Sequence, residues 1–219
     1  MRELIQDRST PLVYVITDRR LLSNQTKGPD LTFLRDFIEQ AAIAGADMVQ
    51  IRERDVTPRA LYDLTEAVTR QARTVGASIL INDRADIAAS TGAGVHLTTR
   101  SLTAEVVRAT LGPDLLIGVS THTLEEAEAA ERDGADFAVF GPVFQTASKR
   151  EYGEPVGLDQ LCRVTNSLSI PVLALGGIKL SNYREALNAG AAGVAGISMF
   201  AETHDLNKLV ATIKGRSVV

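Results

Sequence analysis

One short phrase recurs four times along this sequence of 219 residues. A small residue or Asp is followed by Gly and then by a short apolar run, as in AGADMVQI (44–51), TGAGVHL (91–97), DGADFAVF (133–140) and AGAAGVAGI (189–197). Glycine suits the left-handed residue that ends a helix, and a short, continuously apolar run is typical of a strand buried on both faces. The phrase therefore predicts repeated helix-to-strand junctions, as in a parallel sheet.

Four further apolar runs have the character of strands, at 12–16, 78–81, 115–119 and 171–175, which brings the expected number to eight. Between the expected strands lie stretches with helical patterns, at 31–44, 58–75, 84–91, 103–111, 123–133, 158–167, 182–189 and 205–213. Two of these helices have a candidate N-cap, Asp30 for the first and Thr57 for the second.

Strand followed by helix, repeated in this way, predicts an α/β protein of the (β/α)8 TIM-barrel type, close to the lower size limit of about 200 residues for that fold. A doubly wound open sheet is the alternative. It is disfavoured because no Gly-x-Gly-x-x-Gly follows the first strand and because eight units exceed its usual count. We expect one compact domain across residues 1–219, with residues 1–11 as a loose N-terminal extension.

Composition and charge exclude several classes of protein. Lys and Arg number 23 against 27 Asp and Glu, and the formal net charge of −4 argues against a basic nucleic-acid binder. Cys162 is the only cysteine, which rules out an intramolecular disulfide and a Cys-x-x-Cys metal site. No apolar run approaches the roughly 18 residues of a membrane span, and the N-terminal stretch lacks the apolar core of a signal peptide. The sequence thus predicts a soluble cytoplasmic protein with no nucleic-acid or membrane partner.

Two connections are long, 17–30 after the first expected strand and 141–157 after the sixth. Loops of this length in a compact domain are usually functional or mobile. Both follow the C-terminal ends of strands, which is the face where TIM-barrel active sites are built. Polar residues just after the strands are therefore the candidate site.

The second expected strand ends in Gln50, Ile51, Arg52, Glu53 and Arg54. Alternation along an extended chain places Gln50 and Arg52 on one side, together with Arg54 if the strand continues that far. Two guanidinium groups on one side form an anion clamp, because each offers planar, bidentate donors to phosphate. A solvated ladder of Arg and Glu is the alternative, and the position at a barrel strand end favours the clamp.

The third, fourth and fifth expected strands also end in candidate groups. Asp83, which follows Asn82, is suited to Mg²⁺, a cation that prefers one or two carboxylates plus substrate phosphates; capping the next helix is the alternative. The fourth strand carries His96, and the fifth brings Ser120 and His122. His122 is the candidate general acid/base because an imidazole titrates near neutral pH; a purely structural histidine is the alternative.

Glycines and small residues follow the last two expected strands, at Gly176, Gly177, Ile197 and Ser198. In many barrels the loops after these strands hold a phosphate through backbone N–H groups, which glycine allows to approach closely. A tight strand-to-helix turn is the structural alternative. Thr146, Ser148 and Lys149, in the loop after the sixth strand, are candidates for binding a second anion. Together these positions predict a small anionic substrate.

Eight stretches, in order along nearly the whole chain, match one pattern: YVITDRR (14–20), VQIRERD (49–55), INDRADIA (81–88), VHL (95–97), IGVSTHTLEEA (117–127), GADFAVFGPVFQTASK (134–149), LALGGI (173–178) and GAAGVAGIS (190–198). The most specific pieces are the Gln-x-Arg strand end, Gly-Pro-Val-Phe-x-Thr and Ala-x-Gly-Gly-Ile. The set resembles the thiamine-phosphate synthase/TenI family. This resemblance implies a (β/α)8 barrel that acts in thiamine biosynthesis on a thiazole phosphate.

The family implied by this resemblance contains two chemistries. The synthase joins hydroxymethylpyrimidine diphosphate to thiazole phosphate, expels pyrophosphate and requires Mg²⁺. The TenI-type tautomerase instead aromatises a thiazole carboxylate phosphate by moving a proton, and it needs no cofactor.

The resemblance also implies a role for each candidate residue. The residues on the pyrimidine diphosphate side would be Gln50, Arg52, Asn82 and Lys149, and we assign Arg54 and Ser120 to the same side from their positions at strand ends. Those on the thiazole phosphate side would be Thr146, Ser148, Gly176, Gly177, Ile197 and Ser198. Asp83 would be one ligand of Mg²⁺, and the catalytic groups would be His122, Arg52 and Lys149.

Two residues depart from the synthase pattern. Ser101 stands where the synthase carries the Asp that completes Mg²⁺ binding, and Arg54 stands where a Lys is usual. A serine hydroxyl is a poor substitute for a carboxylate on a hard cation. We therefore expect a TenI-type thiazole tautomerase, with His122 as the proton shuttle and no cofactor.

Two alternatives remain. The first is a thiamine-phosphate synthase with a weakened Mg²⁺ site, favoured by Gln50, Asp83 and Lys149. The second is a non-catalytic regulator that binds thiazole phosphate or thiamine phosphate. A homodimer is compatible with this class of barrel, although the sequence identifies no interface.

Overall fold

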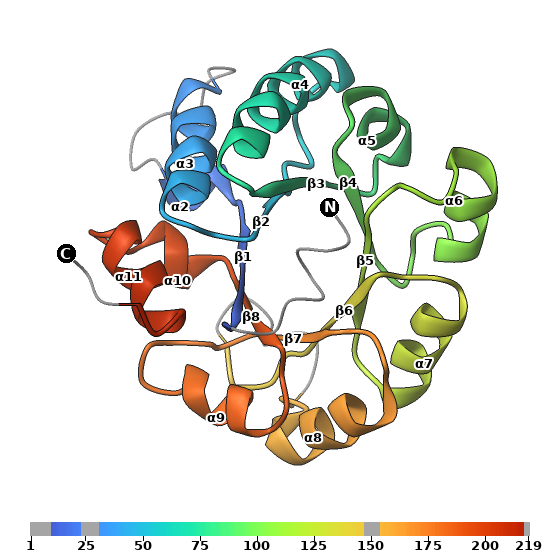
Figure 1. Cartoon of the computed structure of the whole chain (residues 1–219), viewed down its shortest axis with the longest axis vertical. Coiled ribbons are helices and arrows are strands. Elements are labelled where there is room, and N and C mark those ends of the chain that lie inside the picture. Colours follow the sequence, from blue (N-terminus) through green and yellow to red (C-terminus); the bar gives the residue numbers. More distant parts are fainter. Residues whose placement is uncertain (1–9, 23–30, 147–153, 217–219) are drawn as a thin grey trace.

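The strands form a closed parallel barrel surrounded by helices in the computed structural model, which describes residues 10–22, 31–146 and 154–216 (Figure 1). The strands are β1 (Leu12–Ile16), β2 (Met48–Ile51), β3 (Ser78–Asn82), β4 (Gly94–Leu97), β5 (Ile117–Thr121), β6 (Phe137–Phe140), β7 (Val172–Leu175) and β8 (Gly193–Gly196). Each strand pairs with the next in sequence, and β8 pairs with β1 in parallel register, Val13 opposite Val194. The (β/α)8 TIM barrel predicted from the sequence is confirmed.

The helices follow the strands around the barrel. They are α2 (Arg19–Leu22), α3 (Thr32–Ile43), α4 (Pro58–Thr74), α5 (Ala85–Thr91), α6 (Ala104–Leu111), α7 (Leu124–Arg132), α8 (Gly157–Ser167), α9 (Tyr183–Asn188), α10 (Ser198–Ala201) and α11 (Leu206–Ile213). None of the helices in the described part of the chain is long and apolar enough to cross a membrane.

Most boundaries agree with the sequence to within one or two residues. Thr57 caps α4 as expected, because its side chain accepts a hydrogen bond from the Ala60 N–H at 3.4 Å. Asp30 lies outside the described residues, and α3 begins at Thr32 without a side-chain cap. The short α2 and α10 were not predicted, since four residues are too few for a helical period to show.

The aspartate in the phrase Gly-Ala-Asp has a structural role that the sequence did not reveal. Asp47 accepts a hydrogen bond from the Val13 N–H at 2.7 Å, and Asp136 accepts one from the Ile117 N–H at 2.7 Å. Each aspartate lies just before one strand and binds the neighbouring strand, so it completes a backbone hydrogen bond where the ladder starts. This anchor places the start of β5 at Ile117, two residues later than the apolar run suggested.

A cation accompanies each of these aspartates. The Lys214 ammonium lies 2.7 Å from Asp47, and the Arg108 guanidinium lies 2.6 Å from Asp136. Both pairs are largely buried, with side-chain exposures of 4% and 17% for the first and 16% and 12% for the second. In the two of the four phrases that contain Asp, this residue thus contributes both to strand pairing and to a buried ion pair.

Alternate residues of the strands fill the barrel interior. The buried inner cluster includes Tyr14, Met48, Leu80, Leu116 and Phe137. Because strand side chains alternate in direction, Gln50, Asn82 and Ser120 continue three of these inward rows beyond the apolar core.

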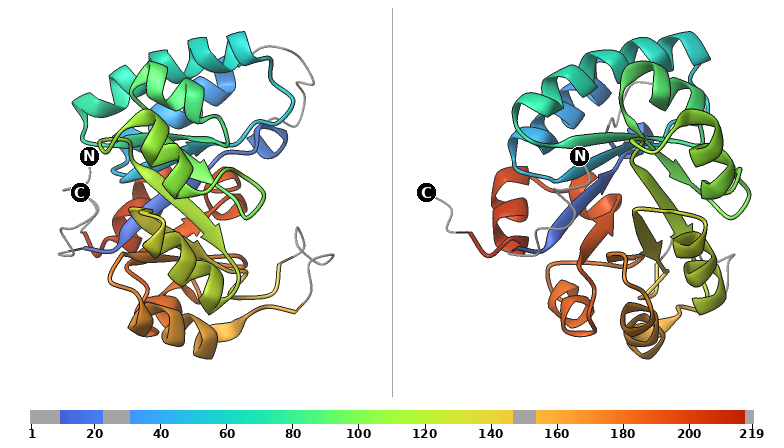
Figure 2. Two further views of the ribbon diagram at one scale, coloured as in Figure 1. Left: turned by 90° about the vertical axis from the view of Figure 1, so that its right-hand side faces the viewer. Right: turned by 45° about the vertical axis from the view of Figure 1, so that its right-hand side comes forward.

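The inward rows therefore become polar at the C-terminal ends of the strands. Figure 2 shows that α2, which follows β1, and the described start of the loop after β6 lie at this same end of the barrel. We call this end the mouth. It is the face on which barrel sites are built.

Candidate active site

Three candidate residues from neighbouring strand ends are linked by hydrogen bonds at the mouth. Gln50 Nε2 donates to Asn82 Oδ1 at 3.0 Å, and Asn82 Nδ2 donates to Asp83 Oδ2 at 3.0 Å. The β2–β3 register places Gln50 opposite Leu80, which lies two residues before Asn82 on the same face of β3. The prediction that these residues share one site is consistent with this geometry.

Asp83 contacts the residue that departs from the synthase pattern. The Ser101 hydroxyl donates a hydrogen bond to Asp83 Oδ1. Ser101 is also fixed in its turn, because the Thr98 N–H donates to Ser101 Oγ at 2.7 Å. A carboxylate at position 101 would therefore lie beside that of Asp83. The serine thus occupies a position from which an acidic residue could share a cation with Asp83.

The capping alternative for Asp83 is wrong. The helix α5 has Arg84 at its N-cap and no side-chain cap. Asp83 instead adopts a left-handed backbone conformation, with φ of 61°, and its carboxylate accepts hydrogen bonds from Asn82 and Ser101. A non-glycine residue in this conformation is uncommon, and Asp is one of the residues that tolerate it.

The donors around Asp83 fit a magnesium ion only in part. Mg²⁺ is commonly held by one or two carboxylates, with substrate phosphates and water completing its octahedron. Across the described segments, no three His, Cys, Asp or Glu side chains converge on a metal position. Asp83 would thus supply the protein carboxylate, and a bound diphosphate would have to supply further oxygens.

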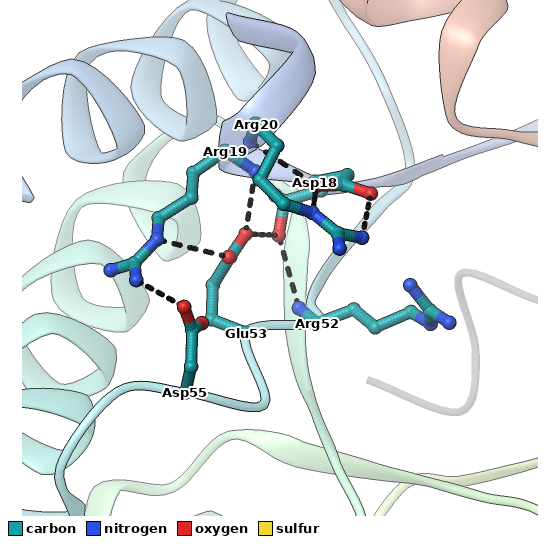
Figure 3. Close-up of polar contacts among 7 residues, drawn as sticks. Asp18, Arg19, Arg20, Arg52, Glu53 and Asp55 are labelled. Atoms are coloured by element: carbon teal, nitrogen blue, oxygen red, sulfur yellow. Dashed lines mark hydrogen bonds and ion pairs between the residues drawn. The ribbon is translucent and has the colours of Figure 1, made fainter. Parts of the chain in front are cut away.

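Arg52 is held in place through its backbone by a buried network that joins β1 to the end of β2 (Figure 3). The Thr17 hydroxyl accepts from the Arg52 N–H at 3.0 Å and donates to Glu53 Oε1 at 2.9 Å. The same Glu53 oxygen accepts from the Arg19 N–H at 3.1 Å. Burial raises the pKa of the Glu53 carboxyl, and the hydrogen bonds from Thr17 and Arg19 oppose that rise.

The network overturns the alternative of a solvated Arg and Glu ladder. Glu53 is 8% exposed and bonds to Thr17 and Arg19, not to the arginines on either side of it. Figure 3 shows the Arg52 side chain extending away from Glu53 and Asp55. The strand β2 ends at Ile51, so the condition under which alternation would place Arg54 on the side of Gln50 and Arg52 is not met.

Arg52 and Arg54 are available to an anion. Neither guanidinium has an ion-pair partner among the residues that the structure describes, whereas Arg19 and Arg20 are paired with Asp55 and Asp18. Burial, followed by the charge of Arg54, lowers the pKa of Arg52 from its ordinary value. Unpaired, partly desolvated positive charge at a strand end attracts a phosphate group strongly.

Ser120, predicted on the pyrimidine side, lies at the end of a buried row of polar groups. His96 Nε2 lies 2.8 Å from Ser120 Oγ, and His96 Nδ1 lies 3.1 Å from the Tyr14 hydroxyl. Burial and, less strongly, the charge of Arg52 lower the pKa of His96 to about 3. His96 is thus a neutral, buried partner of the site.

His122 lies beside an acidic residue at the start of α7. Its Nδ1 lies 3.1 Å from Glu126 Oε2, and its backbone N–H donates to the same oxygen at 2.6 Å. The side chain is 40% exposed, so it is neither a core histidine nor deeply enclosed. The carboxylate orients the ring and leaves Nε2 without a partner in the described chain.

The two glycines after β7 have a packing role. Both have positive φ, 95° at Gly176 and 66° at Gly177. A Cβ at Gly176 would lie 2.5 Å from Pro142 Cβ, and one at Gly177 would lie 2.6 Å from the Gln145 carbonyl oxygen. The turn therefore packs tightly on the loop after β6, as the structural alternative expected, and this packing brings that loop against the β7 end of the mouth.

The remaining predicted residues divide into described and undescribed positions. Ile197 precedes α10, Ser198 is its first residue, and Thr146 lies half-buried at the end of a described segment. Ser148 and Lys149 lie outside the described residues. Their predicted roles stay predictions.

Sequence reasoning missed the residues that support the site. Tyr14, Thr17 and Glu53 contact no candidate substrate group directly; they hold His96 and Arg52. No spacing along one strand reveals such contacts, because each joins two strands that are distant in sequence.

Comparisons with known proteins agree with this geometry. The family model described as thiamine monophosphate synthase, which covers the TenI proteins, matches residues 13–200. A Geobacter sulfurreducens protein, provisionally named as a thiamine-phosphate synthase, is 51% identical over 187 residues, spanning 85% of this chain and 84% of that protein. The thiamine-phosphate synthase of Chlorobium phaeovibrioides is 44% identical over 191 residues, spanning 87% of this chain and 86% of that protein.

A solved structure agrees with these relatives. The thiamine phosphate pyrophosphorylase from Pyrococcus furiosus superposes with a TM-score of 0.81 at 32% sequence identity, covering 95% of this chain and 96% of that one. With the motifs, the barrel and the mouth all in agreement, this chain belongs to the thiamine-phosphate synthase/TenI family of enzymes.

Proposed function

We propose that this chain is a thiamine-phosphate synthase, which couples hydroxymethylpyrimidine diphosphate to thiazole phosphate and releases pyrophosphate. The observation that carries the proposal is the pair of guanidiniums of Arg52 and Arg54, which have no ion-pair partner among the described residues and lie close enough for the charge of Arg54 to lower the pKa of Arg52. The hydrogen-bonded groups of Gln50, Asn82 and Asp83 at the neighbouring strand ends support it. The carboxylate of the tautomerase substrate is also an anion, but a diphosphate carries more negative charge and makes fuller use of two guanidiniums. The names of the similar proteins support the same choice.

The reaction transfers the pyrimidinylmethyl group from a diphosphate oxygen to the thiazole ring nitrogen. The bond between the pyrimidine methylene and the diphosphate oxygen breaks, and the thiazole ring nitrogen forms a new bond to that carbon. Negative charge builds on the departing pyrophosphate, and donors that are already in place there lower the barrier. Arg52 and Arg54 supply such donors, and Lys149 is proposed to join them.

The backbone anchor of Arg52 matters for this role. Because Thr17 and Glu53 fix the Arg52 N–H, the guanidinium starts from a defined position at the mouth. Asp83 would hold Mg²⁺, which when bound neutralises diphosphate charge. Gln50 and Asn82 orient the pyrimidine through their amide groups.

The thiazole phosphate is proposed to bind on the opposite side of the mouth. The turn at Gly176 and Gly177, the start of α10 at Ile197 and Ser198, and the loop residues Thr146 and Ser148 would hold it. The packing of the β7 turn against Pro142 and Gln145 supports this assignment in part, because it brings Gly176 and Gly177 against the described start of the loop after β6.

The test is product formation from the two substrates, with and without Mg²⁺. We expect thiamine phosphate to form with metal, and Arg52→Met to lower kcat by about 10²–10³-fold, as for loss of one preorganised donor. Arg59→Met is the matched control, because Arg59 is a solvent-exposed helix arginine paired with Asp63. Absence of thiamine phosphate at every Mg²⁺ concentration would refute the proposal.

The tautomerase is the second candidate, and the pairing of His122 with Glu126 favours it. An imidazole oriented by a carboxylate can take a proton and return it elsewhere. If this activity is the main one, the protein aromatises thiazole carboxylate phosphate without metal, and His122→Ala lowers that rate about 10²–10⁴-fold. Ligand binding without turnover of either substrate would instead identify a regulator.

A further inference from the structure

Three polar side chains form a row of hydrogen bonds that runs from the barrel core to the mouth. The Tyr14 hydroxyl on β1 lies 3.1 Å from His96 Nδ1 on β4, and His96 Nε2 lies 2.8 Å from Ser120 Oγ on β5. Tyr14 is fully buried and His96 is 2% exposed, whereas Ser120 is half-buried. Only the Ser120 end of the row is therefore accessible to a bound molecule.

An aromatic layer encloses the inner part of this row. The Phe137 ring packs edge-on against Tyr14, with centroids 5.6 Å apart, and lies 6.4 Å from His96. Gly118 leaves room for that ring, because a Cβ at this position would overlap it. Tyr14 and His96 thus meet in apolar surroundings, where an unsatisfied polar group is costly.

The burial of Tyr14 sets the direction of its hydrogen bond. In the described chain His96 Nδ1 is the partner of the Tyr14 hydroxyl, and burial raises the pKa of Tyr14, so that the hydroxyl keeps its proton. Tyr14 therefore donates to Nδ1. Because burial keeps the imidazole neutral, its single ring proton lies on Nε2 and is donated to Ser120 Oγ.

We propose that Tyr14 and His96 are positioning residues, which orient the Ser120 hydroxyl so that it donates a hydrogen bond to the substrate. The Ser120 oxygen is occupied by the His96 N–H, and its own O–H has no acceptor among the described residues. A bound molecule with an acceptor atom supplies the missing partner. The identity of this molecule rests on the proposed function, in which the acceptor belongs to the pyrimidine diphosphate.

The kinetic test compares two buried tyrosines. Tyr14→Phe removes the hydroxyl at the start of the row, whereas Tyr183→Phe removes one that bonds to the Thr212 carbonyl oxygen on the outer helices. We expect Tyr14→Phe to raise the KM for pyrimidine diphosphate about tenfold, the size of one hydrogen bond, with little change in the KM for thiazole phosphate. Tyr183→Phe should change neither. Equal effects of the two variants would overturn the proposal.

A double variant tests whether the two residues act through one hydrogen bond. Ser120→Ala should raise the same KM, and adding Tyr14→Phe to it should cost nothing further, because both remove the same donor to the substrate. Additive losses would show that Tyr14 acts by another route and would contradict the proposal. His96→Gln, which keeps a side-chain N–H donor, should retain more activity than His96→Leu.

Nitrogen-15 NMR tests the direction of the row without any turnover. The chain has three histidines, so selective labelling gives few signals, and His96→Gln identifies the relevant one. We expect the His96 proton on Nε2 in the unaltered protein, and a shift toward Nδ1–H in Tyr14→Phe. A proton on Nδ1 in the unaltered protein would overturn the proposal, even in an active synthase. Failure of the proposed function is recognised separately, by the absence of thiamine phosphate.

Discussion

Replacing Ser101 by aspartate tests the proposed metal site, and the structure allows the resulting change in the free energy of unfolding to be estimated. The Ser101 hydroxyl now donates to the solvent-exposed Asp83 carboxylate, and a hydrogen bond in such a setting contributes about 0.5–1.5 kcal/mol. Ser101→Asp removes that bond and places a second negative charge about 4 Å away, which costs about 1 kcal/mol in water-like surroundings. Without metal, we therefore expect the free energy of unfolding to fall by roughly 1.5–2.5 kcal/mol.

Magnesium should reverse this loss. Two carboxylates match the preference of Mg²⁺ better than one, so the cation binds the folded variant more tightly and stabilises it by mass action. For a chain of this size, 1 kcal/mol corresponds to about 2–4 °C in Tm. We expect thermal unfolding to show a lower Tm for Ser101→Asp without Mg²⁺ and a larger Mg²⁺-induced rise than for the unaltered protein.

The control is Ser101→Asn, which has a similar shape without the charge. We expect it to lose stability without gaining a response to Mg²⁺. Synthase turnover of Ser101→Asp should also saturate at a lower Mg²⁺ concentration. If Mg²⁺ raises the Tm of all three proteins equally, the inference that position 101 completes a cation site beside Asp83 is refuted.

Two further predictions concern the groups that hold the barrel and the mouth together. Asp136→Ala should lower the free energy of unfolding by about 3–5 kcal/mol in chemical denaturation, because it breaks a largely buried pair with Arg108 and leaves the Ile117 N–H unpaired. The control Asp86→Ala breaks an exposed pair and should lower it by less than about 1 kcal/mol, and similar losses in the two variants would refute the role assigned to Asp136. The pKa of His96 falls from 6.5 to about 3 on folding, so between these pH values the unfolded chain binds a proton that the folded protein does not, and stability falls by about 1.4 kcal/mol for each pH unit of acidification. His96→Gln should abolish this contribution, and an unchanged pH dependence of stability would contradict a buried neutral imidazole.

The fold could be predicted from the sequence because its signal is local and repeated. The glycine that ends each helix and the apolar run that follows are neighbours in sequence, so one phrase reports one junction. The aspartate of the same phrase escaped interpretation, since its partner is the backbone of the preceding strand. Asp47 bonds to Val13, 34 residues away, and no pattern within one strand records that contact.

The candidate site divides in the same way. Gln50 and Asn82 were predictable because strand ends of a barrel converge, and the structure links them directly. The roles of Tyr14 and Glu53 could not be predicted, because they depend on burial and on contacts with distant strands. From the sequence Glu53 was one charge in a possible exposed ladder, whereas in the structure it is buried and accepts a hydrogen bond from Thr17.

Two residues that depart from the synthase pattern, Ser101 and Arg54, favoured the tautomerase when the sequence was considered alone. In the structure Ser101 still lies beside Asp83, and Arg54 lies close enough to Arg52 to lower its pKa. These contacts do not separate the two chemistries, and the proposal of a synthase rests on the two guanidiniums that lack an ion-pair partner in the described segments and on the names of the similar proteins.

Phosphorus-31 NMR of one reaction mixture tests this central claim most directly. Purified protein is given hydroxymethylpyrimidine diphosphate, thiazole phosphate and Mg²⁺, and the diphosphate and monophosphate resonances are followed together. The account predicts that pyrophosphate and thiamine phosphate appear in equal amounts as both substrates disappear, and that Arg52→Met slows both together. Diphosphate signals that remain unchanged, in protein that aromatises thiazole carboxylate phosphate, would contradict it.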